Sequence, residues 1–106
     1  MKEFVGRWRI SAMDMWDQDY VNLVEPGFFE FGADGMGSFL FGAVSGWLDA
    51  RVSDRGTRLD FTWQGECEGD EMSGRGWFTF EGGNQADGML FIHDGDESGV
   101  TIEREA

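Results

Sequence analysis

Carboxylates are the commonest ionisable groups in this sequence, and many of them lie in short clusters. Two clusters, Asp14-x-x-Asp17-x-Asp19 and Asp94-Gly95-Asp96-Glu97, loosely follow the spacing of calcium ligands. Neither contains the complete twelve-residue calcium loop with its glutamate at the last position. We therefore expect neither a metal site nor a cofactor.

His93 and Cys67 are the only histidine and the only cysteine. His93 beside a carboxylate would have the chemistry of a general base, although a lone histidine at a strand end is more often structural. Cys67 is flanked by Glu66 and Glu68, and these like charges should raise the pKa of its thiol, which argues against a nucleophile. The sequence has no Ser-His-Asp elbow, phosphate-binding glycine loop or His-Glu-x-x-His motif. We expect a non-enzymatic protein and keep a small enzyme that uses His93 as an alternative.

Composition limits the classes of partner. The 106 residues carry a net charge of −13 and are 41% hydrophobic, which fits one packed domain spanning residues 1–106. Such a chain repels nucleic acid and anionic membranes, and it favours cationic ligands or basic protein surfaces. One cysteine excludes an intramolecular disulfide. No signal peptide or run of about 18 apolar residues is visible, so we expect a cytoplasmic protein.

The side chains that might form a site must be positioned by β-strands. Alternating apolar and polar residues or aromatic runs between turn signals predict eight short strands, at residues 4–12, 28–33, 37–43, 47–52, 57–64, 75–81, 87–93 and 100–104. Long loops are predicted at 13–27 and 65–74, and a hairpin turn at Asp34-Gly35. Consecutive strands joined in this way predict an all-β fold, an eight-stranded antiparallel up-and-down β-barrel. A β-sandwich is the rival fold.

Gly6-x-Trp8 on the first strand, followed by a long loop, resembles the calycins, which are the lipocalin-like and avidin-like barrels. The segment 29–39 also resembles the second hairpin of bacterial lipocalin-like domains, and the chain is similar to small bacterial proteins of unknown function. The resemblance implies that Trp8 closes one end of the barrel and that Arg104, on the last strand, packs across it. It implies no specific ligand, because no residue pattern matches a biotin or retinoid pocket.

Alternate connections of an up-and-down barrel lie at the same end. The first, third, fifth and seventh connections carry eleven of the 21 acidic residues: Asp14, Asp17, Asp19, Glu25, Glu66, Glu68, Asp70, Glu71, Asp94, Asp96 and Glu97. We call this end of the barrel the acidic end, and we expect it to lie opposite Trp8. Trp47 and Trp77, which begin predicted strands, and His93, which ends one, are predicted to lie near it.

An acidic rim with exposed aromatic rings can attract and stack a cationic or planar ligand. We therefore predict a binding module for a small cationic or planar ligand, whose site residues are Trp16, Asp17, Asp19, Tyr20, Trp47, Trp77, His93 and Asp96. The alternative is an acidic interaction or inhibitor protein that mimics nucleic acid and binds a basic partner surface. It also remains open that the two strand tryptophans are core residues and that Trp16 and Tyr20 only fold the long loop onto the barrel.

Overall fold

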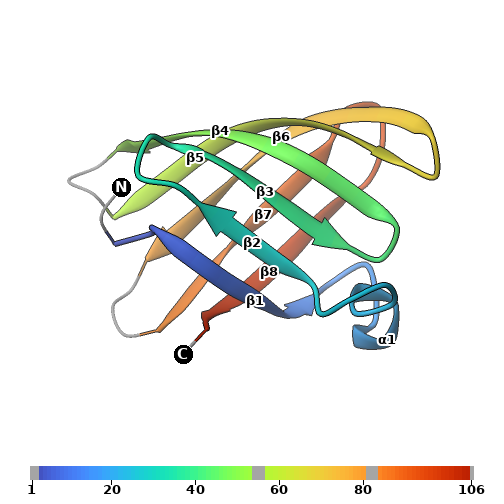
Figure 1. Ribbon diagram of the computed structural model, residues 1–106, viewed down its shortest axis with the longest axis horizontal. Coiled ribbons are helices and arrows are strands. Elements are labelled where there is room, and N and C mark those ends of the chain that lie inside the picture. The colour runs from blue at the N-terminus through green and yellow to red at the C-terminus, as the bar shows by residue number, and fades with distance from the viewer. Residues whose placement is uncertain (1–2, 54–56, 81–83, 106) are drawn as a thin grey trace.

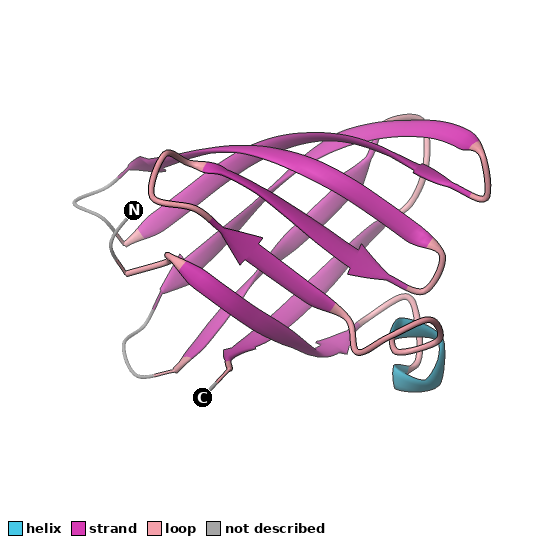
Figure 2. Cartoon of the chain, in the orientation of Figure 1, coloured by secondary structure: helices cyan, strands magenta, loops and turns pink. Residues whose placement is uncertain are grey.

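The protein is a closed antiparallel barrel of eight strands in a computed structural model, which describes residues 3–53, 57–80 and 84–105. The strands pair in chain order, and β8 returns to β1 (Figure 1). The elements are β1 (Gly6–Met13), α1 (Gln18–Val21), β2 (Phe28–Phe31), β3 (Met36–Phe41), β4 (Val44–Ser53), β5 (Arg58–Cys67), β6 (Asp70–Phe80), β7 (Gln85–Ile92) and β8 (Glu97–Arg104). The predicted fold class is confirmed. Figure 2 shows α1 as a short helix outside one end of the barrel.

Four predicted strand boundaries are wrong by three residues or more. β4 begins at Val44 rather than at 47, β5 continues to Cys67 rather than to 64, β6 begins at Asp70 rather than at 75, and β8 begins at Glu97 rather than at 100. The predicted 65–74 loop is therefore mostly strand, closed by a two-residue turn in which Glu68 and Gly69 have φ angles of 51° and 91°. Within residues 65–74, only that turn requires positive φ values.

The other glycines of this hairpin allow close strand pairing. A Cβ atom at Gly65 would lie 1.8 Å from the Ser45 carbonyl oxygen, and one at Gly74 would lie 1.9 Å from that of Phe91. The glycines that suggested a loop are therefore packing positions within the sheet.

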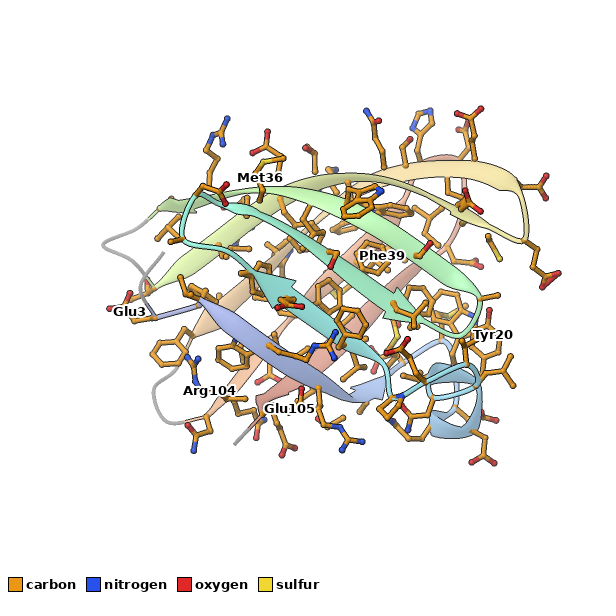
Figure 3. All side chains as sticks on the ribbon, in the orientation of Figure 1. Glu3, Tyr20, Met36, Phe39, Arg104 and Glu105 are labelled. Atoms are coloured by element: carbon orange, nitrogen blue, oxygen red, sulfur yellow. The ribbon has the colours of Figure 1, made fainter. Side chains whose placement is uncertain are left out.

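Aromatic rings fill the interior of the barrel. Phe29 is fully buried, and its ring centroid lies 5.0 Å from that of Phe78, 5.1 Å from that of Phe39 and 5.9 Å from that of Phe61. Figure 3 shows Phe39 inside the barrel. These rings come from β2, β3, β5 and β6, so inward-facing phenylalanines from two pairs of neighbouring strands pack against one another inside the barrel.

Trp8 closes the end of the barrel where both chain termini lie (Figure 1). Its indole N–H donates to the Phe4 carbonyl at 3.0 Å, and the Arg104 guanidinium lies 4.3 Å from the centroid of its ring. Arg104 also donates to the carbonyl oxygens of Val5 and Glu3. The contact that the calycin resemblance implied is therefore present.

The segment between β1 and β2 covers the opposite end. The Asp17 carboxylate caps α1 by accepting the Tyr20 N–H at 2.9 Å, and Val21 is completely buried. The Trp16 ring lies 4.9 Å from the Phe41 ring, and Tyr20 is also packed against the core. The long loop thus folds onto the barrel end as a plug, with Tyr20 at this end in Figure 3.

The predicted Asp34-Gly35 turn is confirmed, with Gly35 at a φ of 89°. The sequence also predicts turns at 53–56 and 82–86. Residues 54–56 and 82–83 lie outside the described residues, whereas Ser53 ends β4 and Gln85 begins β7. In the described part of the chain, no helix has the length and apolar character needed to cross a membrane.

Candidate functional site

The acidic end is defined in the structure by the connections 14–27, 42–43, 68–69 and 93–96, which lie opposite the chain termini (Figure 1). Seven of the eleven acidic residues lie in these connections, and the other four, Glu66, Asp70, Glu71 and Glu97, lie at the adjoining strand ends. All eleven are exposed, and no lysine or arginine lies in these connections. The Lys/Arg ion pairs found among the described residues, Arg7–Glu30, Arg51–Asp49 and Arg58–Asp60, all lie elsewhere on the barrel. The negative charge of this end is therefore not neutralised by neighbouring Lys or Arg side chains.

Four of the eight predicted site residues belong to the plug. Trp16 and Tyr20 are partly buried against the core, and one carboxylate oxygen of Asp17 caps α1. Asp19 is exposed in the first turn of α1. Trp16, Tyr20 and Asp17 thus have structural roles, and Asp19 is the member of the four without such a contact.

His93 and Asp96 lie in the connection between β7 and β8, and both are exposed. The His93 imidazole Nε2 lies 3.5 Å from an Asp94 carboxylate oxygen, with side-chain exposures of 75% and 91%. A proton-transfer pair this open has no shielding from water. Among the described residues, no three histidine, cysteine, aspartate or glutamate side chains converge as metal ligands would.

Trp47 and Trp77 point outward from the barrel wall, so neither is a core residue. Their predicted placement at the beginning of strands is wrong, because β4 begins three residues before Trp47 and β6 begins seven residues before Trp77. At about 3.3 Å per residue, Trp77 lies roughly 23 Å along β6 from its first residue, toward the termini. There it is partly buried, with the Arg58 guanidinium 4.6 Å from its ring centroid. Trp47 is 73% exposed.

Trp47 borders a groove of about 850 Å³ on the outer surface of β3–β7. Strand pairing aligns Trp47 with Gln64 and Gln64 with Ser73, which gives the groove one row of an indole and two uncharged polar side chains. His93 is attached to the end of this row, because its N–H donates to the Ser73 carbonyl at 2.7 Å. The groove is within the size range of small-molecule sites.

The same row continues into a second recess toward the acidic end. Trp47, Gln64, Ser73 and His93 line both hollows, and the second also contains the carboxylates Glu66, Glu71 and Asp94. We call the first of these two hollows the Trp47 groove. The three carboxylates lie beside it, in the second recess. A ligand stacked on the indole would therefore have uncharged hydrogen-bonding groups beneath it and carboxylates at one side.

Arg75 supplies the opposite charge to the Trp47 groove. Its guanidinium lies 4.2 Å from the Phe91 ring centroid, and the residue is exposed. Within the described ranges, no carboxylate oxygen lies within 4 Å of it, whereas Arg51 and Arg58 on the same outer surface both pair with aspartates.

Cys67 ends β5 beside the acidic hairpin turn. Partial burial raises the pKa of its thiol, and the carboxylates of Glu68 and Asp70 raise it further. The predicted direction of the pKa shift is confirmed, but burial is its largest cause, and the contributing charges are Glu68 and Asp70 rather than the predicted Glu66 and Glu68.

Sequence reasoning missed Gln64, Ser73 and Phe91 as parts of the groove. The signal that would have found them is cross-strand register, since each is an outward residue opposite another outward residue. That register depends on the position of the β5–β6 turn. The sequence predicts a long loop there, so the pairing of Gln64 with Ser73 was not predicted.

Comparison with known proteins adds no assignment, because no protein-family model, curated protein or solved structure matches the chain. Fold and site therefore define the class directly: a small, closed antiparallel barrel with a filled interior and a groove on its outer wall.

Proposed function

We propose that this protein is a non-enzymatic binding module that takes a small cationic, planar ligand in the Trp47 groove. The ring of the ligand stacks on the Trp47 indole, and its cationic group faces Glu66, Glu71 and Asp94. This proposal keeps the predicted ligand class but moves the site from the barrel end, which the plug covers, to the outer wall. Of the predicted site residues, Trp47 and His93 border this groove.

One observation carries the proposal: an indole that is 73% exposed stands in a groove that opens toward unneutralised carboxylates. Leaving a large aromatic ring in water forgoes the roughly 1.5–3 kcal/mol that burial of such a side chain provides. A cation stacked on an indole contributes about 0.5–1 kcal/mol at an exposed site, and about 2 kcal/mol when water is excluded. The surrounding carboxylates raise the local concentration of cations.

Titration with benzamidinium and with neutral benzamide tests the proposal, because the two share a planar ring and differ in charge. We expect benzamidinium to bind more tightly at low salt, to lose this advantage at high salt, and to lose affinity in Trp47→Ala. The control variant is Trp77→Ala, which removes an outer tryptophan away from the groove. Equal binding of the two compounds by calorimetry, or equal loss in the two variants, would refute the proposal.

The second candidate function is an acidic interaction protein that occupies a basic groove on a partner, as nucleic acid would. It is favoured by the eleven exposed carboxylates gathered at one end without lysine or arginine among them. Charge reversal at Glu68, in the β5–β6 turn, and at Asp70, the first residue of β6, should then abolish partner binding, while reversal at Glu30 on the barrel wall should not. Recovery of only those proteins that any polyanion recovers would count against this function.

A further inference from the structure

We infer that the Trp47 groove is a bipolar site in which Arg75 binds an anionic group, so that its ligand is a planar zwitterion rather than a simple cation. This inference rests on the proposed function and adds the second charge of the ligand. It concerns the side of the groove away from the acidic end.

Arg75 is prepared for an anion by its surroundings. The guanidinium carbon lies 4.2 Å from the Phe91 ring centroid, and this cation–π contact holds the group over the outer surface of the sheet. Two carboxylates share the aligned row with Arg75, each two strands away: Asp49, which is engaged by Arg51 at 2.7 Å, and Glu97, on the far side of Phe91. Neither forms an ion pair with Arg75 in the described part of the chain. Thr62, directly opposite Arg75 in the β5–β6 ladder, places a hydroxyl beside it. An arginine held in this way can donate two parallel hydrogen bonds to a carboxylate.

The strand register sets the spacing of the charges. Arg75 pairs with Thr62, Ser73 with Gln64, and Glu71 with Glu66. These three outward rows are two residues apart, so adjacent rows are separated by about 7 Å and the outer two by about 13 Å along the strands. Trp47 belongs to the middle row. The groove therefore presents a cation, an aromatic platform and a pair of carboxylates in that order.

The net charge of the chain selects among ligands with this order. A simple anion is repelled by a protein of charge −13. A zwitterion carries no net charge. Its anionic end would lie at the Arg75 row and its cationic end at the row of Glu66 and Glu71. A simple cation uses only the indole and the carboxylates. The arrangement therefore fits a planar body with an amidinium or ammonium group at one end and a carboxylate at the other.

Three probes separate these ligands: benzamidinium, 4-amidinobenzoate and benzoate. Calorimetry at low salt should give roughly tenfold tighter binding of 4-amidinobenzoate than of benzamidinium, because charge-assisted hydrogen bonds to Arg75 are added. Benzoate should show no measurable binding. In Arg75→Gln the advantage of 4-amidinobenzoate should disappear while benzamidinium binding is kept. Arg9→Gln is the matched control, since it makes the same change in net charge on β1, outside the groove.

Each outcome decides between the claims. Benzamidinium binding that requires Trp47, without any gain from the added carboxylate, would overturn the bipolar site and leave the proposed function intact. Failure of both compounds to bind would overturn both. A gain that survives Arg75→Gln, or that Arg9→Gln removes equally, would show that Arg75 is not the anion subsite. Circular dichroism of each variant confirms that the barrel is folded.

Discussion

Replacing Phe29 by alanine tests whether the barrel interior is a packed core. The Phe29 side chain is fully buried, and four phenylalanine rings lie with centroids 5.0–6.3 Å from its own. Removing a buried phenylalanine costs about 3–5 kcal/mol, and least where neighbours can collapse into the space. Rings fixed on four separate strands have little freedom to collapse, so we expect a loss near 4 kcal/mol in the free energy of unfolding.

Phe28→Ala is the matched control, because Phe28 is the same residue type one position earlier and points outward. It is partly buried, with the Arg7 guanidinium 3.8 Å from its ring centroid. Its removal should cost about 1 kcal/mol, mainly from the lost stacking. Urea unfolding followed by circular dichroism measures both values. At roughly 4 °C per kcal/mol for a domain of this size, the melting temperature should fall by about 16 °C in Phe29→Ala.

The cavity left by Phe29→Ala gives a second measurement. An apolar cavity lined by rings stays dry and takes up benzene, so benzene should partly restore the stability of Phe29→Ala and leave Phe28→Ala unchanged. A loss below about 1.5 kcal/mol for Phe29→Ala, or equal losses for the two variants, would refute a filled interior. An open barrel would then accommodate a ligand inside.

Three further predictions concern the plug, the sheet and the thiol. Gly42→Ala should loosen the plug, seen as faster amide hydrogen exchange at Val21, because Gly42 has a φ of 56° and a Cβ atom there would lie 2.1 Å from a Tyr20 ring carbon; Gly69→Ala, with φ 91° and no atom within 4 Å of its Cβ position, should show backbone strain alone. Gly74→Ala should lower the melting temperature by separating β6 from β7, because its Cβ would meet the Phe91 carbonyl, whereas Ser73→Ala beside it should change little. Alkylation of Cys67 should require a higher pH in the folded protein than in urea, because burial and then Glu68 and Asp70 raise the pKa of its thiol. Between the thiol pKa of the unfolded chain and the higher pKa of the folded protein, the folded state keeps a proton that the unfolded chain releases. The Cys67 thiol therefore lowers the free energy of unfolding as the pH rises through this interval.

The eight strands and their order were predictable because alternation and turn residues are local signals. Residues 28–31 illustrate this, since Phe29 and Phe31 are buried while Glu30 is exposed. The position of the β5–β6 turn could not be predicted from the sequence. Gly65, Gly69 and Gly74 look equivalent there, although only Gly69 of the three has a positive φ. Because that turn was predicted as a long loop, the end of β5 and the beginning of β6 were predicted wrongly as well.

The sequence predicted the negative charge near the candidate site but not the position of the groove on the barrel. Counting connections correctly put eleven carboxylates at one end, because strand parity does not depend on exact boundaries. Trp47 was placed at that end because β4 was predicted to begin too late, and its outward direction depended on the same boundary. The groove arises from outward residues on five neighbouring strands, β3 to β7, and such an arrangement requires the three-dimensional register.

Both chain termini lie at the Trp8 end of the barrel, while the unneutralised carboxylates lie at the other end (Figure 1). The molecule is consequently a strong electric dipole along the barrel's length. Near a positively charged surface it will rotate before it touches, and it will arrive with the plug and hairpin turns first. A tether attached to either terminus would trail behind, so surface-immobilised copies should all present the same end to solution.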